Sequence, residues 1–164
     1  MSPVVLLSMA AVVAVLLGAR VLLPALPIRG RARRLSQVDA VLAGAGLAGL
    51  AFHCLAMFFR RTVEWVPGAD AVTADIRSLG TTSIIWYVVP AVLVLVGLRH
   101  QHPGALAVVA VALTAVGVTM YDGGSLQTHL GAIFGSVLVF ALVAATVMLP
   151  PWGPEPQPSR RRSA

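Results

Sequence analysis

Apolar residues gather in five long runs that fill most of this chain. The runs cover residues 3–23, 38–59, 84–98, 104–121 and 128–149. A helix that crosses a bilayer needs about 20 apolar residues, with about 17 as the lower limit. Backbone polar groups in hydrocarbon must be bonded within the protein, so each run predicts a helix. The expected fold class is therefore an all-α, polytopic membrane protein with five transmembrane helices.

Composition agrees with this pattern and leaves no room for a soluble domain. The 164 residues are 58% hydrophobic and 11% charged, with a mean hydropathy of +0.88. We expect residues 1–149 to form one transmembrane domain. Residues 150–164 hold five prolines and three consecutive arginines. This composition predicts an extended, disordered cytoplasmic tail.

The basic residues are all arginine, and most of them fall in alternate gaps between the runs. One set of gaps carries Arg29, Arg31, Arg33, Arg34, Arg99, Arg160, Arg161 and Arg162. The other set carries Arg60, Arg61 and Arg77. The positive-inside rule then predicts an external N-terminus and a cytoplasmic C-terminus. It also explains the net charge of +6 without a nucleic-acid partner.

A cleaved signal peptide is the competing interpretation of the first run. Signal peptides carry positive charge before their apolar region, whereas here the arginines follow it. We therefore expect an uncleaved first helix.

Residues 60–82 form the only sizeable loop, on the predicted outer side. Val72, Ile76 and Leu79 recur at helical spacing, which predicts a short amphipathic helix over residues 71–79. We expect this apolar stripe to be shielded, and Asp75 and Arg77 to be solvated.

Several polar residues have structural explanations. Ser36 and Asp39 have the spacing of a capping box at the start of the second span. Pro90 should kink the third span. His100 and His102 lie in a short loop, which we interpret as a solvated turn.

His53 is the leading candidate for chemistry, because ionisable residues inside spans are rare and often functional. It shares a helical face with Gly46, Gly49 and Met57. The glycines indicate that another helix packs closely on that face. His53 should therefore point into the bundle.

His129, Met57 and Met120 fall at a depth similar to that of His53. Two imidazoles and two thioethers at one level match the ligand preferences of copper, and the imidazoles match those of haem. The competing interpretation is structural, in which each histidine donates a hydrogen bond to a carbonyl of a neighbouring helix. Both interpretations remain open at this point.

Gly131 and Gly135 form a G-x-x-x-G motif in the last span. The motif allows close packing against a helix, either within the chain or in a dimer, and we expect internal packing. The sequence shows no nucleophile–base pair, phosphate-binding loop or paired carboxylates, so we do not expect an enzyme.

The arginine-rich stretch at residues 29–34 and the His-Cys-Leu-Ala-Met stretch at residues 53–57 carry a resemblance. The chain resembles small actinobacterial membrane proteins with five spans, an arginine-rich first inside loop and His and Met residues within spans. The resemblance implies no activity.

We therefore expect a non-catalytic protein of the bacterial plasma membrane, acting as an accessory or interaction subunit of a larger complex. Its expected partners are the lipid bilayer and other membrane proteins or a second copy of itself. The alternatives are a haem- or copper-binding membrane protein with a site at His53 and His129, and a small transporter component.

Overall fold

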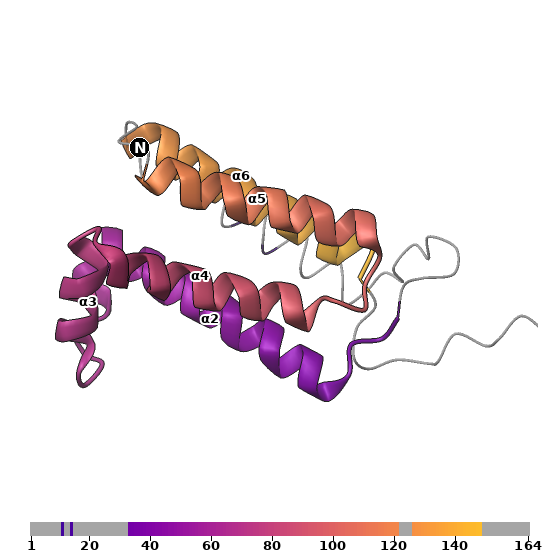
Figure 1. The fold of residues 1–164 in the computed structure, drawn as a ribbon, viewed down its shortest axis with the longest axis horizontal. Coiled ribbons are helices and arrows are strands. Elements are labelled where there is room, and N and C mark those ends of the chain that lie inside the picture. The colour runs from indigo at the N-terminus through magenta and orange to yellow at the C-terminus, as the bar shows by residue number, and fades with distance from the viewer. Residues whose placement is uncertain (1–10, 12–13, 15–32, 122–125, 149–164) are drawn as a thin grey trace, which may run out of the picture.

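The computed structural model describes residues 11, 14, 33–121 and 126–148, and this part of the chain is helical (Figure 1). Its elements are α2 (Gln37–Phe58), the 3-10 turn η1 (Arg60–Thr62), α3 (Ala69–Arg77), α4 (Thr81–Gly97), α5 (Pro103–Tyr121) and α6 (Leu126–Thr146). The first predicted span, apart from residues 11 and 14, and the predicted tail lie outside the described residues.

The four long helices coincide with the second to fifth apolar runs to within three residues at either end. Three of them, α2, α5 and α6, are long and apolar enough to cross a membrane. The fourth, α4, has 17 residues and meets the same criterion only together with α3, to which it is joined at a bend of 106°. The described residues thus contain three candidate spans, or four if the bent pair is one span. This content indicates a membrane protein.

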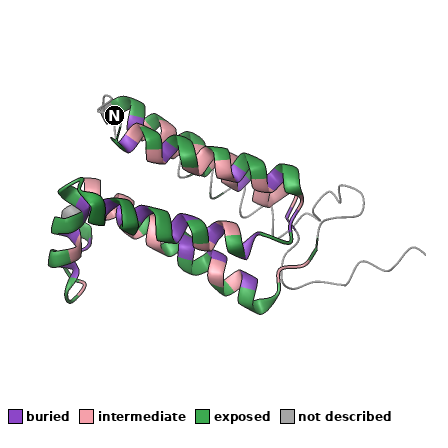
Figure 2. Ribbon diagram, viewed as in Figure 1, coloured by how far each residue is buried: buried purple, intermediate pink, exposed green. Residues whose placement is uncertain are grey.

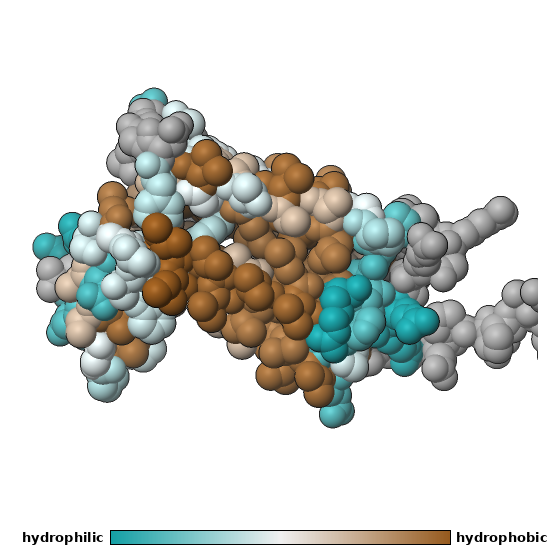
Figure 3. All heavy atoms as spheres, viewed as in Figure 1, coloured by the Kyte–Doolittle hydropathy of each residue, from teal (hydrophilic) through white to brown (hydrophobic). Residues whose placement is uncertain are grey.

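The long helices form two antiparallel pairs, α2 with α4 and α5 with α6 (Figure 1). α3 packs against α2 and α4 at the end of the bundle where α2 and α5 finish, and we call this the α3 end. The opposite end holds Arg33, Arg34 and Arg99, and we call it the arginine end. The face drawn in Figure 3 has an apolar band over the long helices and a hydrophilic patch at the arginine end.

The contact between α2 and α4 depends on glycines at which the two backbones nearly touch. A Cβ atom added at Gly46 would lie 2.6 Å from the Pro90 carbonyl oxygen. One added at Gly97 would lie 2.5 Å from the Ala43 nitrogen. Separations below 3 Å leave no room for a side chain, so this crossing requires glycine. The helix continues through Pro90, whose side chain also lies against Gly49.

The short helix α3 lies two residues nearer the N-terminus than predicted. It follows Gly68, whose φ of 79° is in the left-handed region that glycine favours. Its buried residues are Ala69, Thr73 and Ile76. The expectation that Leu79 is shielded is wrong, because the helix ends at Arg77 and Leu79 is 47% exposed with a φ of 52°. Asp75 and Arg77 are exposed. Figure 2 shows that buried and exposed positions alternate along this short helix.

Two buried apolar clusters join the helix pairs, one on each side of the middle of the bundle. The cluster nearer the arginine end consists of Ala43, Val94, Leu98, Val109 and Met148. The cluster nearer the α3 end consists of Tyr87, Ala91, Val116 and Met120. Each cluster draws residues from both helix pairs, so burial of these side chains holds the pairs together.

The glycine contact predicts the effect of adding one methyl group to α2. Gly46→Ala should lower the free energy of unfolding by about 1–3 kcal/mol, because the new Cβ overlaps the backbone of α4. Gly44→Ala is the matched control, since a Cβ there meets no atom within 4 Å. Denaturant titration in detergent micelles measures both variants. Equal stability of the two would show that the α2–α4 crossing is looser than described.

Candidate functional site

His53 lies near the α3 end of α2 and points between the two helix pairs. Its side chain is buried, with 2% of the residue exposed. The imidazole Nε2 lies 3.2 Å from the Met120 sulfur on α5. The His53 and Tyr87 rings pack edge to face, with 5.6 Å between their centroids, and Tyr87 lies on α4. His53 therefore contacts helices from both pairs, and its polar partner is a thioether rather than the expected carbonyl.

This contact determines where the imidazole proton resides. A thioether sulfur has no proton to give, so the hydrogen bond requires the proton on Nε2 of His53. Nδ1 is then an acceptor, and it is buried with no hydrogen-bond partner among the described residues. A buried acceptor without a partner is costly, and most such groups in proteins are satisfied. His53 thus carries an unused nitrogen lone pair inside the bundle.

His129 lies in the first turn of α6 and is 6% exposed. Its Nδ1 is 3.1 Å from the Thr119 hydroxyl, which itself lies 3.0 Å from the Val116 carbonyl oxygen. The hydroxyl proton goes to that carbonyl, so His129 Nδ1 donates and its lone pair remains on Nε2. The ring centroid of Phe58 on α2 is 5.7 Å away.

The two methionines singled out by the sequence belong to the same region. Met120 is buried, and Met57 is partly buried and packs against the cluster that contains Met120. We call His53, Met57, Met120 and His129 the His–Met cluster. Throughout the described part of the chain, no three His, Cys, Asp or Glu side chains are placed to hold a metal ion. A metal in this cluster would depend on thioethers together with imidazole.

The four candidate packing glycines divide into two kinds. Gly46 and Gly49 lie in the close contact between α2 and α4. Gly131 and Gly135 are exposed, and a Cβ added at either would meet no described atom within 4 Å. The G-x-x-x-G motif is therefore open in the described part of the chain. Gly135 borders a groove of about 440 Å³ on the α5/α6 pair, whereas Gly131 is not among the residues that line it. The groove is lined by Ala107, Val108, Val111, Ala112, Ala132, Gly135, Ser136 and Val139.

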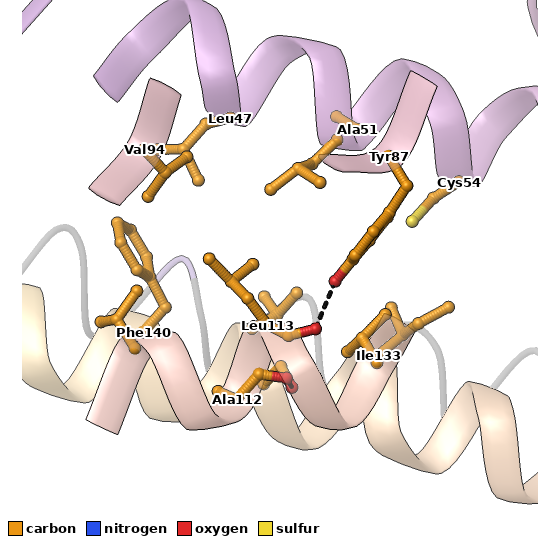
Figure 4. A pocket seen from close by; sticks show the side chains of 14 residues that line it. Leu47, Ala51, Cys54, Tyr87, Val94, Ala112, Leu113, Ile133 and Phe140 are labelled. Carbon is orange, nitrogen blue, oxygen red and sulfur yellow. Dashed lines mark hydrogen bonds between the residues drawn. The ribbon is translucent and has the colours of Figure 1, made fainter. Parts of the chain in front are cut away.

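An apolar cavity of about 310 Å³ lies between the two helix pairs (Figure 4). Tyr87 reaches across its edge from α4 and donates a hydrogen bond of 2.6 Å to the Leu113 carbonyl oxygen. Ser136, also on the wall, donates to the Ala112 carbonyl oxygen at 3.0 Å. Because these hydroxyl protons are already engaged, the wall suits a hydrocarbon group such as a lipid acyl chain.

A second polar cluster, at the arginine end, was only partly predicted. The Ser36 hydroxyl oxygen accepts from the Asp39 backbone nitrogen at 3.1 Å, as a capping box requires. The Asp39 carboxylate, which is 2% exposed, also lies 2.9 Å from the Arg99 guanidinium. Its other oxygen lies 3.1 Å from His100 Nδ1. The turn that contains His100 is therefore fastened to the start of α2, while the His100 side chain remains about half exposed, as expected for a solvated turn.

Comparison of the chain with protein-family models, with curated proteins and with solved structures finds no match. The assignment of function therefore depends on the geometry of the described residues.

The contacts of Asp39 with Arg99 and His100 predict a measurable loss of stability when the carboxylate becomes an amide. Asp39→Asn should lower the free energy of unfolding by about 1–2 kcal/mol, since the charge-assisted contacts disappear. The loss stays small because Arg99 and His100 are about half exposed and can turn to water. Asp75→Asn, at an exposed site on α3, is the control. An equal effect of the two changes would mean that the Asp39 contacts add nothing to stability.

Proposed function

We propose that this chain is a non-catalytic, multi-pass protein of the bacterial plasma membrane that acts as an accessory or interaction subunit of a larger complex. The observation that carries this proposal is the open groove beside Gly135 on the α5/α6 pair, with Gly131 also open one turn away. Small residues on a membrane helix allow a second helix to approach closely. A groove lined by them is a surface suited to helix association.

We also propose that the chain has five spans, with its N-terminus outside and its C-terminus in the cytoplasm. The antiparallel order of α2, α4, α5 and α6 supports this topology, because it brings Arg33, Arg34 and Arg99 to one end. An excess of arginine favours the cytoplasmic side. An external N-terminus requires one further span before Arg33, and the apolar run at residues 3–23 is long enough to supply it.

Topology reporters test this orientation directly. A fusion after residue 149 should be active with a reporter that works only in the cytoplasm, because the arginine end is held there. A fusion after Gly68, in the loop before α3, should be active only with a periplasmic reporter and serves as the matched control. Periplasmic activity of the fusion after residue 149 would contradict five spans with an external N-terminus.

The groove needs an occupant from outside the described residues, and we assign it to a helix of a partner subunit. The described helices leave it empty, although α5 and α6 pack against each other along its floor. Its lining is apolar, so an occupant gains van der Waals contact and loses no hydrogen bond. The competing occupant is the chain's own first apolar run, residues 3–23.

Filling the groove should break the association. Gly135→Leu should shift the native complex to a smaller size, because the larger side chain blocks the approach of a helix. Gly44→Leu is the control, since it adds the same side chain at another open glycine, on α2. Native electrophoresis of solubilised membranes measures both variants against the unmodified chain.

Disulfide trapping separates the two occupants. In a Cys54→Ser background, a cysteine at position 135 should not couple efficiently to cysteines placed along residues 3–23. Efficient coupling within a single chain would show that the groove is filled internally. That result, or an unchanged complex in Gly135→Leu, would overturn the assignment of the groove to a partner.

A further inference from the structure

We propose that His53 and Met120 form a binding site for a copper(I) ion, with Met57 as an additional thioether ligand. This inference goes beyond the interaction role proposed above and does not depend on it. It begins from the contact of 3.2 Å between His53 Nε2 and the Met120 sulfur. The second observation is that Nδ1 of His53 is buried and has no hydrogen-bond partner among the described residues, so it can accept a proton.

The chemistry of the donor atoms selects the kind of ion. Thioether sulfur is a soft ligand and prefers copper(I), whereas carboxylate and carbonyl oxygens prefer hard ions. The cluster offers imidazole nitrogen and thioether sulfur, and none of its four members is acidic. Its ligands are all neutral. A monovalent ion in this apolar setting therefore carries a smaller desolvation cost than a divalent one.

The distance between the two ligand atoms fits a single ion. Metal–ligand bonds are about 2.0 Å to nitrogen and about 2.3 Å to sulfur, as in zinc sites. Two such bonds at one ion place the ligand atoms roughly 3 to 4.3 Å apart, depending on the angle between them. The observed 3.2 Å lies within this range. The same contact leaves no space for a haem macrocycle between His53 and Met120.

Binding requires one proton to move within His53. In the metal-free state the proton is on Nε2 and bonds the Met120 sulfur, as argued above. When Nε2 and the sulfur bind copper(I), the proton transfers to Nδ1, so the imidazole remains neutral. No proton leaves the protein, and the site gains one positive charge. The unused Nδ1 position provides the place that this proton needs.

His129 is not required as a ligand in this proposal. Its Nδ1 already donates to Thr119, and its Nε2 lone pair is free of that bond. His129 therefore serves as an informative comparison within the same cluster, since its replacement changes the surroundings without removing either primary ligand.

The test is a competition titration of the full-length chain, purified in detergent, against a chromophoric copper(I) chelator. One ion should bind per chain, and zinc(II) at the same concentration should not compete. His53→Gln and Met120→Leu should each weaken copper(I) binding at least about tenfold. Replacing a residue that merely holds a metal ligand in place already lowers metal affinity about 10–100-fold, and these two changes remove a ligand itself. Met57→Leu should produce a smaller loss.

Two control variants remove the same residue types elsewhere. Met148→Leu replaces a buried methionine of the other apolar cluster, and His102→Gln replaces a histidine in the loop before α5. Both should bind copper(I) like the unmodified chain. X-ray absorption at the copper edge should show nitrogen and sulfur neighbours, and Met120→Leu should reduce the sulfur contribution.

Thermal unfolding without metal shows whether each variant is folded. If Met120→Leu unfolds at a much lower temperature than the unmodified chain, the copper(I) titrations of Met57→Leu and His53→Gln test the site instead. The proposal is overturned if the folded unmodified chain fails to bind copper(I). It is also overturned if folded His53→Gln retains full affinity, or if the bound copper has no sulfur neighbour.

Discussion

The close approach of α2 and α4 is the constraint on which the rest of the structure depends. Backbone atoms of the two helices nearly touch at Gly46 and Gly97, so their relative rotation and register are fixed by contact. This register brings His53 beside Tyr87 near one end. It brings Asp39 beside Arg99 at the other. Membrane helices gain little from apolar burial against each other, so close backbone packing is an effective way to fix geometry.

The two helix pairs are joined differently from the helices within each pair. Near the α3 end, hydrogen bonds cross between the pairs, from Tyr87 to the Leu113 carbonyl oxygen and from Tyr121 to Ser83. Toward the arginine end, an apolar cluster and the loop between α4 and α5 make the connection. The middle is left with an apolar cavity of about 310 Å³. The pairs are thus held together at both ends and are incompletely packed in the centre.

The sequence predicted the long helices well, because in apolar spans the length and position of a helix follow directly from composition. It also indicated that His53 and Met120 lie at one depth, since helical rise converts residue number into depth. It did not predict that α3 ends before Leu79, where the Ser78 hydroxyl donates to the Asp75 carbonyl oxygen and accepts from the Gly80 nitrogen. Nor did it predict the contact of His100 with Asp39, which joins residues 61 positions apart. Such contacts follow from which helices are neighbours, and helical periodicity alone does not specify that.

The His–Met cluster draws its residues from both helix pairs, since His53 and Met57 lie on α2, Met120 on α5 and His129 on α6. Any displacement of one pair relative to the other therefore changes the distance between His53 Nε2 and the Met120 sulfur. The open groove of Gly135 lies on the same α5/α6 pair that carries Met120. If a partner helix seated in that groove displaced this pair, the separation of the two proposed copper ligands would change with it. By reciprocity, copper(I) at His53 and Met120 would alter the affinity of the groove for its partner. The groove and the proposed copper ligand Met120 thus share the α5/α6 pair, and each proposal is tested separately.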